Sequence, residues 1–122
     1  MPFVEILWNK EKVTEEDLLE IRDNIPQLVA KYLTRFDPSN IVTPPMVAVR
    51  VIEMGVYDQI DACLYITVLA RYEESRSICS SKIIGSVMKG LEKTKVLQTG
   101  KDVSVELVLT HHSSSFDYST LE

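Results

Sequence analysis

The chain has 122 residues, of which 45% are hydrophobic, and its 13 Lys and Arg against 18 Asp and Glu give a net charge of −5 at pH 7. This length suffices for a single domain, residues 1–122, with a core that needs neither disulfides nor a metal. The acidic balance without a basic patch argues against nucleic acid or an anionic membrane as partner, and the apolar runs are too short for a bilayer span or secretory signal. We therefore expect a cytoplasmic domain that binds neither.

The chain begins with a segment typical of a strand, FVEILWN (3–9), and Pro2 stands directly before it. One explanation is structural, because the first residue of a strand is a sheet position that proline tolerates. The other explanation is chemical. If Met1 is removed, Pro2 becomes a secondary amine at the chain end, and such an amine can act as a base.

A long helix is predicted from residue 15 to residue 36. Thr14 can cap its first turn, with Asp17 at the capping-box position. Its apolar residues recur at spacings of three and four: Leu18, Ile21, Ile25, Leu28, Tyr32 and Phe36. Pro26 removes a backbone hydrogen bond inside this pattern, so we expect the helix to kink or split near Asn24.

After the proline-rich connector 37–45, the remaining elements are predicted as two strands, a helix and a last strand. The strands are VAVRVIEM (47–54) and ACLYITVLAR (62–71), and DVSVELVLTH (102–111) follows the helix. The second helix is expected over 75–97, with an apolar stripe of Ile84, Val87, Met88 and Leu91.

The order strand, helix, strand occurs twice along the chain, which indicates two similar halves. The halves are about 2–54 and 62–111, and a polar tail follows at 112–122. Right-handed crossovers make each half a βαβ unit and bring both helices to the same face of one sheet. We therefore expect an α+β fold in which two helices pack on one face of a four-stranded mixed sheet.

The opposite face of this sheet should also be apolar. In the third strand Leu64, Ile66 and Val68 point one way, whereas Cys63, Tyr65 and Leu69 point the other way. Two helices can cover only one of these sides, and an exposed apolar sheet would be an interaction surface. We expect other copies of the chain to cover it in a homo-oligomer.

A chain that starts Met-Pro-strand and contains two βαβ halves resembles the tautomerase superfamily, which includes 4-oxalocrotonate tautomerase, 5-carboxymethyl-2-hydroxymuconate isomerase and macrophage migration inhibitory factor. The run VRVIEM is similar to the second strand of 4-oxalocrotonate tautomerase, whose arginine is catalytic, and this points to Arg50. SRSICSSK is similar to the Gly-Arg-Ser context of the isomerase and points to Arg76, although Ser75 replaces the glycine. Pro2 matches the amino-terminal proline base.

The resemblance implies a homotrimer that moves a proton on a small 2-keto or 2-hydroxy-dienoic acid without a cofactor. This reaction needs a base with a pKa near the working pH and a cation that stabilises the developing enolate. A terminal amine ordinarily titrates at about 8, and desolvation and nearby guanidinium groups lower that pKa. Pro2 would be the base; of Arg50 and Arg76, one would bind the substrate carboxylate and the other would polarise the carbonyl.

Alternatives exist for each residue of this set. Arg50 and Arg76 could form surface salt bridges, and Arg71, at the end of the third strand, could replace either of them. The same fold could serve as a structural or binding trimer without catalysis if Met1 is retained. The same element order also occurs in ferredoxin-like and ACT-type domains that bind small ligands, in which another strand lies between the two strands of each unit.

No residue pattern indicates a metal or a cofactor. His111 and His112 are adjacent and therefore on opposite strand faces, without acids or cysteines to complete a ligand set. The four glycines are scattered, so no phosphate-binding loop is present. Cys63 and Cys79 lack a metal or redox spacing, and we expect two free thiols.

Overall fold

The structure is a computed structural model that describes residues 2–111. Met1, His112 and the tail predicted at 112–122 lie outside the described residues. The elements are β1 (Phe3–Trp8), α1 (Glu15–Phe36), the 3-10 helix η1 (Pro44–Met46), β2 (Ala48–Glu53), β3 (Leu64–Arg71), α2 (Glu74–Ile78), α3 (Ser80–Leu91), α4 (Lys95–Gln98) and β4 (Val103–Thr110). All four strands begin and end within two residues of the predicted bounds.

The first helix has the predicted bounds, and the hydroxyl of Thr14 accepts a hydrogen bond from the Asp17 amide at 3.2 Å. The predicted split near Asn24 is wrong, since α1 continues through Pro26 as one helix. Proline removes a single amide here, and the flanking side chains of Ile25 and Val29 are fully buried. Tertiary packing of this face outweighs the local cost, which is about 3 kcal/mol for an interior proline.

The predicted second helix is wrong as one element, because the segment forms three helices. A serine-rich stretch separates α2 from α3 at Cys79, and serine side chains compete for backbone hydrogen bonds. The α3 helix ends where the buried Thr94 hydroxyl donates to the Leu91 carbonyl at 2.6 Å. Its buried stripe is Ile83, Val87 and Leu91, so the prediction is right for Val87 and Leu91 and wrong for Ile84 and Met88, which are half-buried.

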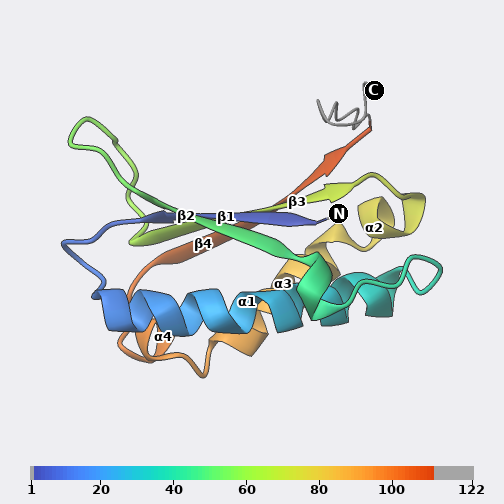
Figure 1. The fold of residues 1–122 in the computed structure, drawn as a ribbon, viewed down its shortest axis with the longest axis horizontal. Helices are drawn as coiled ribbons and strands as arrows, with labels where there is room; N and C mark the ends of the chain where they lie inside the picture. The colour runs from blue at the N-terminus through green and yellow to red at the C-terminus, as the bar shows by residue number, and fades with distance from the viewer. Residues whose placement is uncertain (1, 112–122) are drawn as a thin grey trace, which may run out of the picture.

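The strand order is β2-β1-β3-β4, with β1 parallel to β2, β3 parallel to β4, and β1 antiparallel to β3. Each βαβ half therefore keeps its two strands side by side, and the helices lie together on one side of the sheet (Figure 1). This confirms the expected α+β fold with a four-stranded mixed sheet. It excludes the ferredoxin-like alternative, in which the strands of each unit are separated.

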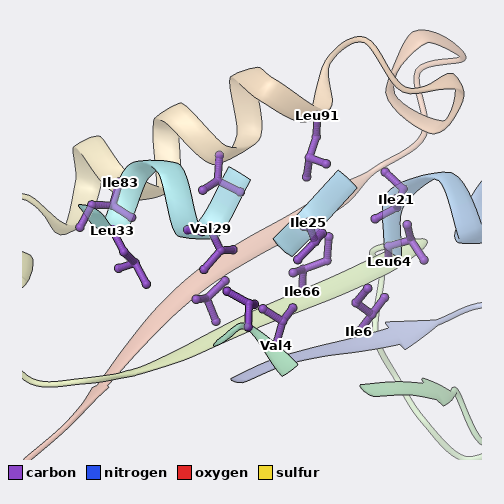
Figure 2. Close-up of a cluster of buried hydrophobic side chains, with 14 of the residues drawn as sticks. Val4, Ile6, Ile21, Ile25, Val29, Leu33, Leu64, Ile66, Ile83 and Leu91 are labelled. Carbon is purple, nitrogen blue, oxygen red and sulfur yellow. The ribbon is translucent and has the colours of Figure 1, made fainter. Parts of the chain in front are cut away.

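The hydrophobic core lies between the helix-facing side of the sheet and helices α1 and α3 (Figure 2). Strands contribute alternate residues, because successive side chains point to opposite faces. The labelled core residues are Val4, Ile6, Ile21, Ile25, Val29, Leu33, Leu64, Ile66, Ile83 and Leu91. The prediction that Leu64, Ile66 and Val68 share one face is confirmed, and that face is the buried one.

The sheet face away from the helices, called the open face below, is only partly apolar. Strand register places a polar row across its centre: Arg50, Glu5, Thr67 and Glu106. A mostly apolar row lies on each side of it. One row consists of Ile52, Leu7, Tyr65 and Ser104, and the other consists of Ala48, Phe3, Leu69 and Val108. The Tyr65 hydroxyl donates to Glu106 at 2.7 Å, and this hydrogen bond raises the pKa of Tyr65.

A matched pair of glycines tests the packing of α3 on α1. A Cβ at Gly90 would overlap the Cδ2 atom of Leu28, whereas a Cβ at Gly85 has nothing within 4 Å. Gly85→Ala should raise the free energy of unfolding by about 0.5–1 kcal/mol, because alanine is the better helix former. Gly90→Ala should lower it by about 1 kcal/mol or more, because the core must shift to accept the methyl group. Urea denaturation followed by circular dichroism measures both, and equal stabilisation by the two variants would contradict the close helix contact.

Candidate functional site

Pro2 borders a cavity of about 220 Å³, called the proline pocket below. It is buried directly before β1, and its carbonyl accepts a hydrogen bond from the Ala48 amide at 3.1 Å. The other lining residues come from the loop after α1, from η1 and from the β3–α2 junction: Asn40, Ile41, Val42, Met46, Arg71, Glu73 and Arg76. The pocket thus brings together the residue before β1, the α1–β2 connection of the first half and the β3–α2 connection of the second half.

Arg76 is the buried cation of the proline pocket, with a residue exposure of 5%. Its Nε atom lies 3.1 Å from Oδ2 of Asp37, which is itself 3% exposed, and its Nη1 donates to the Arg71 carbonyl at 2.9 Å. The Nε hydrogen is not directed at an acceptor, so the contact with Asp37 is mainly electrostatic. A buried guanidinium needs such a counter-charge, because an unpaired charge away from water is costly.

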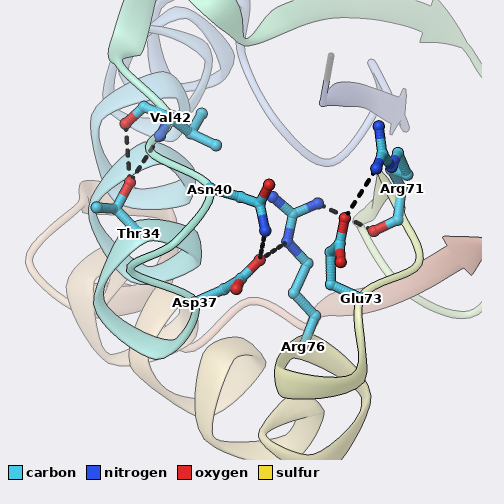
Figure 3. Close-up of polar contacts among 7 residues, drawn as sticks. All are labelled: Thr34, Asp37, Asn40, Val42, Arg71, Glu73 and Arg76. Carbon is cyan, nitrogen blue, oxygen red and sulfur yellow. Dashed lines mark hydrogen bonds and ion pairs between the residues drawn. The ribbon is translucent and has the colours of Figure 1, made fainter.

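Asp37 ends α1 and organises the loop that follows it (Figure 3). Its Oδ2 atom also accepts a hydrogen bond from the Asn40 side chain at 3.0 Å. Further along this loop, Thr34 and Val42 exchange two hydrogen bonds, in which the threonine hydroxyl donates at 3.0 Å and accepts at 2.8 Å. These contacts fix the loop wall of the proline pocket to the last turns of the helix.

Arg71 provides a second guanidinium at the pocket. It ends β3, its side chain is 72% exposed, and its Nη2 atom lies 3.2 Å from Oε1 of Glu73. Figure 3 shows the Glu73 side chain turned towards Arg71, with which it forms the ion pair. The proline pocket therefore contains two guanidinium groups, one fixed and buried, the other at the solvent boundary.

Arg50 lies elsewhere. It is not among the residues that line the proline pocket, and it belongs to the central row of the open face. Its Nη2 donates to Glu5 at 3.0 Å, and its guanidinium carbon lies 5.9 Å from the centre of the Phe3 ring. Of the three predicted catalytic residues, the structure brings Pro2 and Arg76 to one cavity and places Arg50 on the open face of the same chain.

Sequence reasoning did not single out Asp37, Asn40 or Glu73. Asp37 and Asn40 lie in the proline-rich connector, where polar residues are ordinary, and Glu73 is one acid among many. The one available signal was indirect, since a buried arginine requires an acidic partner. It could be used only once the burial of Arg76 was known.

A second cavity, of about 450 Å³, lies beyond the carboxyl ends of β1 and β2. Its walls include Lys10 and Glu53, whose charged atoms are 3.9 Å apart, and Asp58, whose carboxylate accepts a hydrogen bond from the Gly55 amide at 2.6 Å. None of the predicted catalytic residues lines it.

Within residues 2–111, no three His, Cys, Asp or Glu side chains are grouped as a metal site would require. No helix in the same range is both long and apolar enough to cross a bilayer.

The sequence matches no protein-family model and no curated protein. Solved structures match it by fold. 5-Carboxymethyl-2-hydroxymuconate delta-isomerase is 14% identical, with a TM-score of 0.61 and coverage of 96% of this chain and 86% of that chain. Pt0534 inactivated by 2-oxo-3-pentynoate is 18% identical, with a TM-score of 0.58 over 88% of this chain and 85% of that chain. The chain has a tautomerase fold.

A further tautomerase-fold structure, a fused 4-OT asymmetric trimer, is 11% identical, with a TM-score of 0.51 and coverage of 88% of this chain and 85% of that chain. At these identities the likeness establishes the tautomerase fold alone. The short sequence matches around Arg50 and Arg76 therefore lie in a fold that is shared with these structures. The catalytic roles of the two arginines stay predictions.

Asp37→Asn tests the buried ion pair. The substitution keeps the shape of the side chain but leaves the Arg76 guanidinium without its counter-charge, so the free energy of unfolding should fall by about 3–5 kcal/mol. Asp23→Asn is the matched control, because it breaks an exposed pair with Arg22 at 3.0 Å and should cost less than about 1 kcal/mol. Chemical denaturation gives both values, and similar losses would show that the buried pair does not hold the pocket.

Proposed function

We propose that this chain is a cofactor-independent tautomerase or isomerase that moves a proton on a small 2-keto or 2-hydroxy-dienoic acid, with the Pro2 nitrogen as the base. The observation that carries the proposal is the single cavity bordered by Pro2, Arg71 and Arg76. A base and two cations at one cavity are what proton transfer next to a carbonyl requires. The tautomerase fold agrees with this chemistry, and so does the inactivation of Pt0534 by a 2-keto acid.

The base would be the secondary amine that Pro2 acquires once Met1 is removed. Its nitrogen takes a proton from the carbon next to the carbonyl, and the electron pair of that C–H bond moves towards the carbonyl oxygen. The same nitrogen then returns the proton to another carbon of the conjugated system, or to the enolate oxygen, in which case the enol is released. The pyrrolidine ring fixes one direction for the lone pair, which reduces the loss of orientational entropy during transfer.

The two guanidinium groups of the pocket would have separate roles. Arg71, at the solvent boundary, is suited to bind the substrate carboxylate through two parallel hydrogen bonds. Arg76 is held rigidly by Asp37 and by the Arg71 carbonyl, so it is suited to polarise the carbonyl that becomes the enolate. Arg50 would act only in the pocket of a neighbouring subunit, since its side chain belongs to the open face.

The assembly that we propose is a homotrimer formed through the open face, in the cytoplasm. The apolar rows that flank the Arg50–Glu106 row are not covered by the helices, and burial against other copies would remove them from water (Figure 1). The fused 4-OT structure with this fold is a trimer. Cys63 and Cys79 are both free thiols, as expected in a reducing compartment.

A binding or structural oligomer with the same fold is the alternative function. It applies if the mature protein keeps Met1, because the Pro2 nitrogen is then part of an amide and cannot act as a base. The intact mass of the protein purified without a tag separates the two functions. Loss of one methionine mass supports the enzyme.

Turnover of an enolisable acid tests the catalytic proposal. The Met-free protein should speed the keto–enol conversion of phenylpyruvate, followed by the absorbance of the enol. Pro2→Ala should reduce this rate by about a hundredfold or more, because it replaces the fixed secondary amine of the base. Pro26→Ala, inside α1 and away from the pocket, is the control and should keep the rate. A Met-free protein no faster than its Pro2→Ala variant would refute the function.

A charge on the open face tests the trimer. Leu69 lies in an apolar row between Phe3 and Val108, so Leu69→Lys should convert the trimer to monomers. Val56, which is 93% exposed in the loop after β2, provides the control, and Val56→Lys should leave the trimer intact. Light scattering after size exclusion gives the mass of each. A wild-type monomer, or a Leu69→Lys trimer, would contradict the proposed interface.

A further inference from the structure

Glu73 places a carboxylate of the protein itself at Arg71, one of the two arginines of the proline pocket. Its Oε1 atom lies 3.2 Å from Nη2 of Arg71, and its side chain is 27% exposed. Figure 3 shows this side chain turned towards Arg71, and the dashed line marks their ion pair. A carboxylate in this position makes the contact that a carboxylate ligand of Arg71 would make.

The position of Glu73 is not required by the helix that follows. Glu73 is the N-cap residue of α2, but its side chain makes no capping hydrogen bond. Among the described residues, Arg71 is the one ion-pair partner of its carboxylate. The charge of Glu73 is therefore directed at Arg71, and its side chain has no part in capping the start of α2.

The charges of the pocket balance only because of Glu73. Arg71 and Arg76 carry two positive charges, and Asp37, paired with Arg76 and 3% exposed, cancels one of them. Glu73 cancels the other. A carboxylate ligand would compete with Glu73 for the Arg71 guanidinium, because two carboxylates at one guanidinium repel each other.

We propose that Glu73 occupies the carboxylate subsite of the proline pocket and is displaced from Arg71 when a 2-keto acid binds. This rests on the proposed function for the class of ligand. Glu73 thus competes with the substrate carboxylate for Arg71 and lowers the affinity of the pocket for the substrate. Since the Arg71 side chain is 72% exposed, the pair is weak, and competition should lower the affinity by no more than about fivefold.

Glu73→Gln tests this competition, with Glu74→Gln as the matched control. Both substitutions remove one negative charge at neighbouring positions, but Glu74 is exposed and does not line the pocket. The probe is benzoylformate, a 2-keto acid with no enolisable hydrogen, so binding is measured by calorimetry without turnover. Its methyl ester, which lacks the carboxylate, is the neutral probe.

Glu73→Gln should bind benzoylformate up to about fivefold more tightly than wild type does, with no change for the methyl ester. Glu74→Gln should change neither affinity. The gain should disappear in the Arg71→Gln/Glu73→Gln double variant, because the guanidinium that Glu73 releases is then missing. Glu73→Ala should show the same direction of change, which covers the case of a poorly folded glutamine variant.

Equal gains in Glu73→Gln and Glu74→Gln would overturn the proposal in favour of a general charge effect. Weaker binding by Glu73→Gln would overturn it too, because Glu73 would then support Arg71 instead of competing with the ligand. These outcomes are distinct from failure of the proposed function. Binding gains without any phenylpyruvate turnover would refute catalysis and keep the subsite, whereas turnover without a binding gain would refute the role of Glu73 alone.

Discussion

The ion pair between Arg76 and Asp37 determines how the proline pocket is built. Asp37 ends α1 in the first half of the chain, and Arg76 belongs to α2 in the second half, so one buried contact links the two halves. Burial makes the contact obligatory, because either charge alone away from water would be costly. Asn40 and the Arg71 carbonyl attach the loop and the end of β3 to the same pair. The shape of the pocket therefore follows from an electrostatic constraint more than from apolar packing.

The elements with strong periodicity could be predicted from the sequence. The four strands and α1 follow directly from alternating or helical apolar spacing. The failures have local causes that periodicity does not contain. The helix predicted over 75–97 extended beyond both ends of its apolar stripe, across a serine-rich break at Cys79 and a threonine stop at Thr94, and the side-chain pattern located neither interruption. At Pro26 the error was the reverse, since an interruption was predicted where the helix is continuous. Buried side chains before and after Pro26 stabilise the helix despite the missing amide hydrogen bond.

The candidate site was partly predictable for a similar reason. Pro2 and Arg76 came from short resemblances, and the structure places both at one cavity. The place of Arg50 depends on which strand face the helices cover, which is a property of the whole sheet. Alternation alone showed that Arg50 shares a face with Ala48 and Ile52, but tertiary structure was needed to show that this is the open face. The partners Asp37 and Glu73 depend on long-range contacts, for which a single sequence carries no signal.

The antiparallel pairing of β1 with β3 relates the two halves by an approximate two-fold rotation, yet a polypeptide has one amino terminus. The start of the second half is an interior peptide unit, and the Cys63 amide there donates to the Asp102 carbonyl at 2.7 Å. An amine base can exist at the equivalent place in the first half only. The joining of two βαβ units into one polypeptide thus limits each molecule to a single terminal amine.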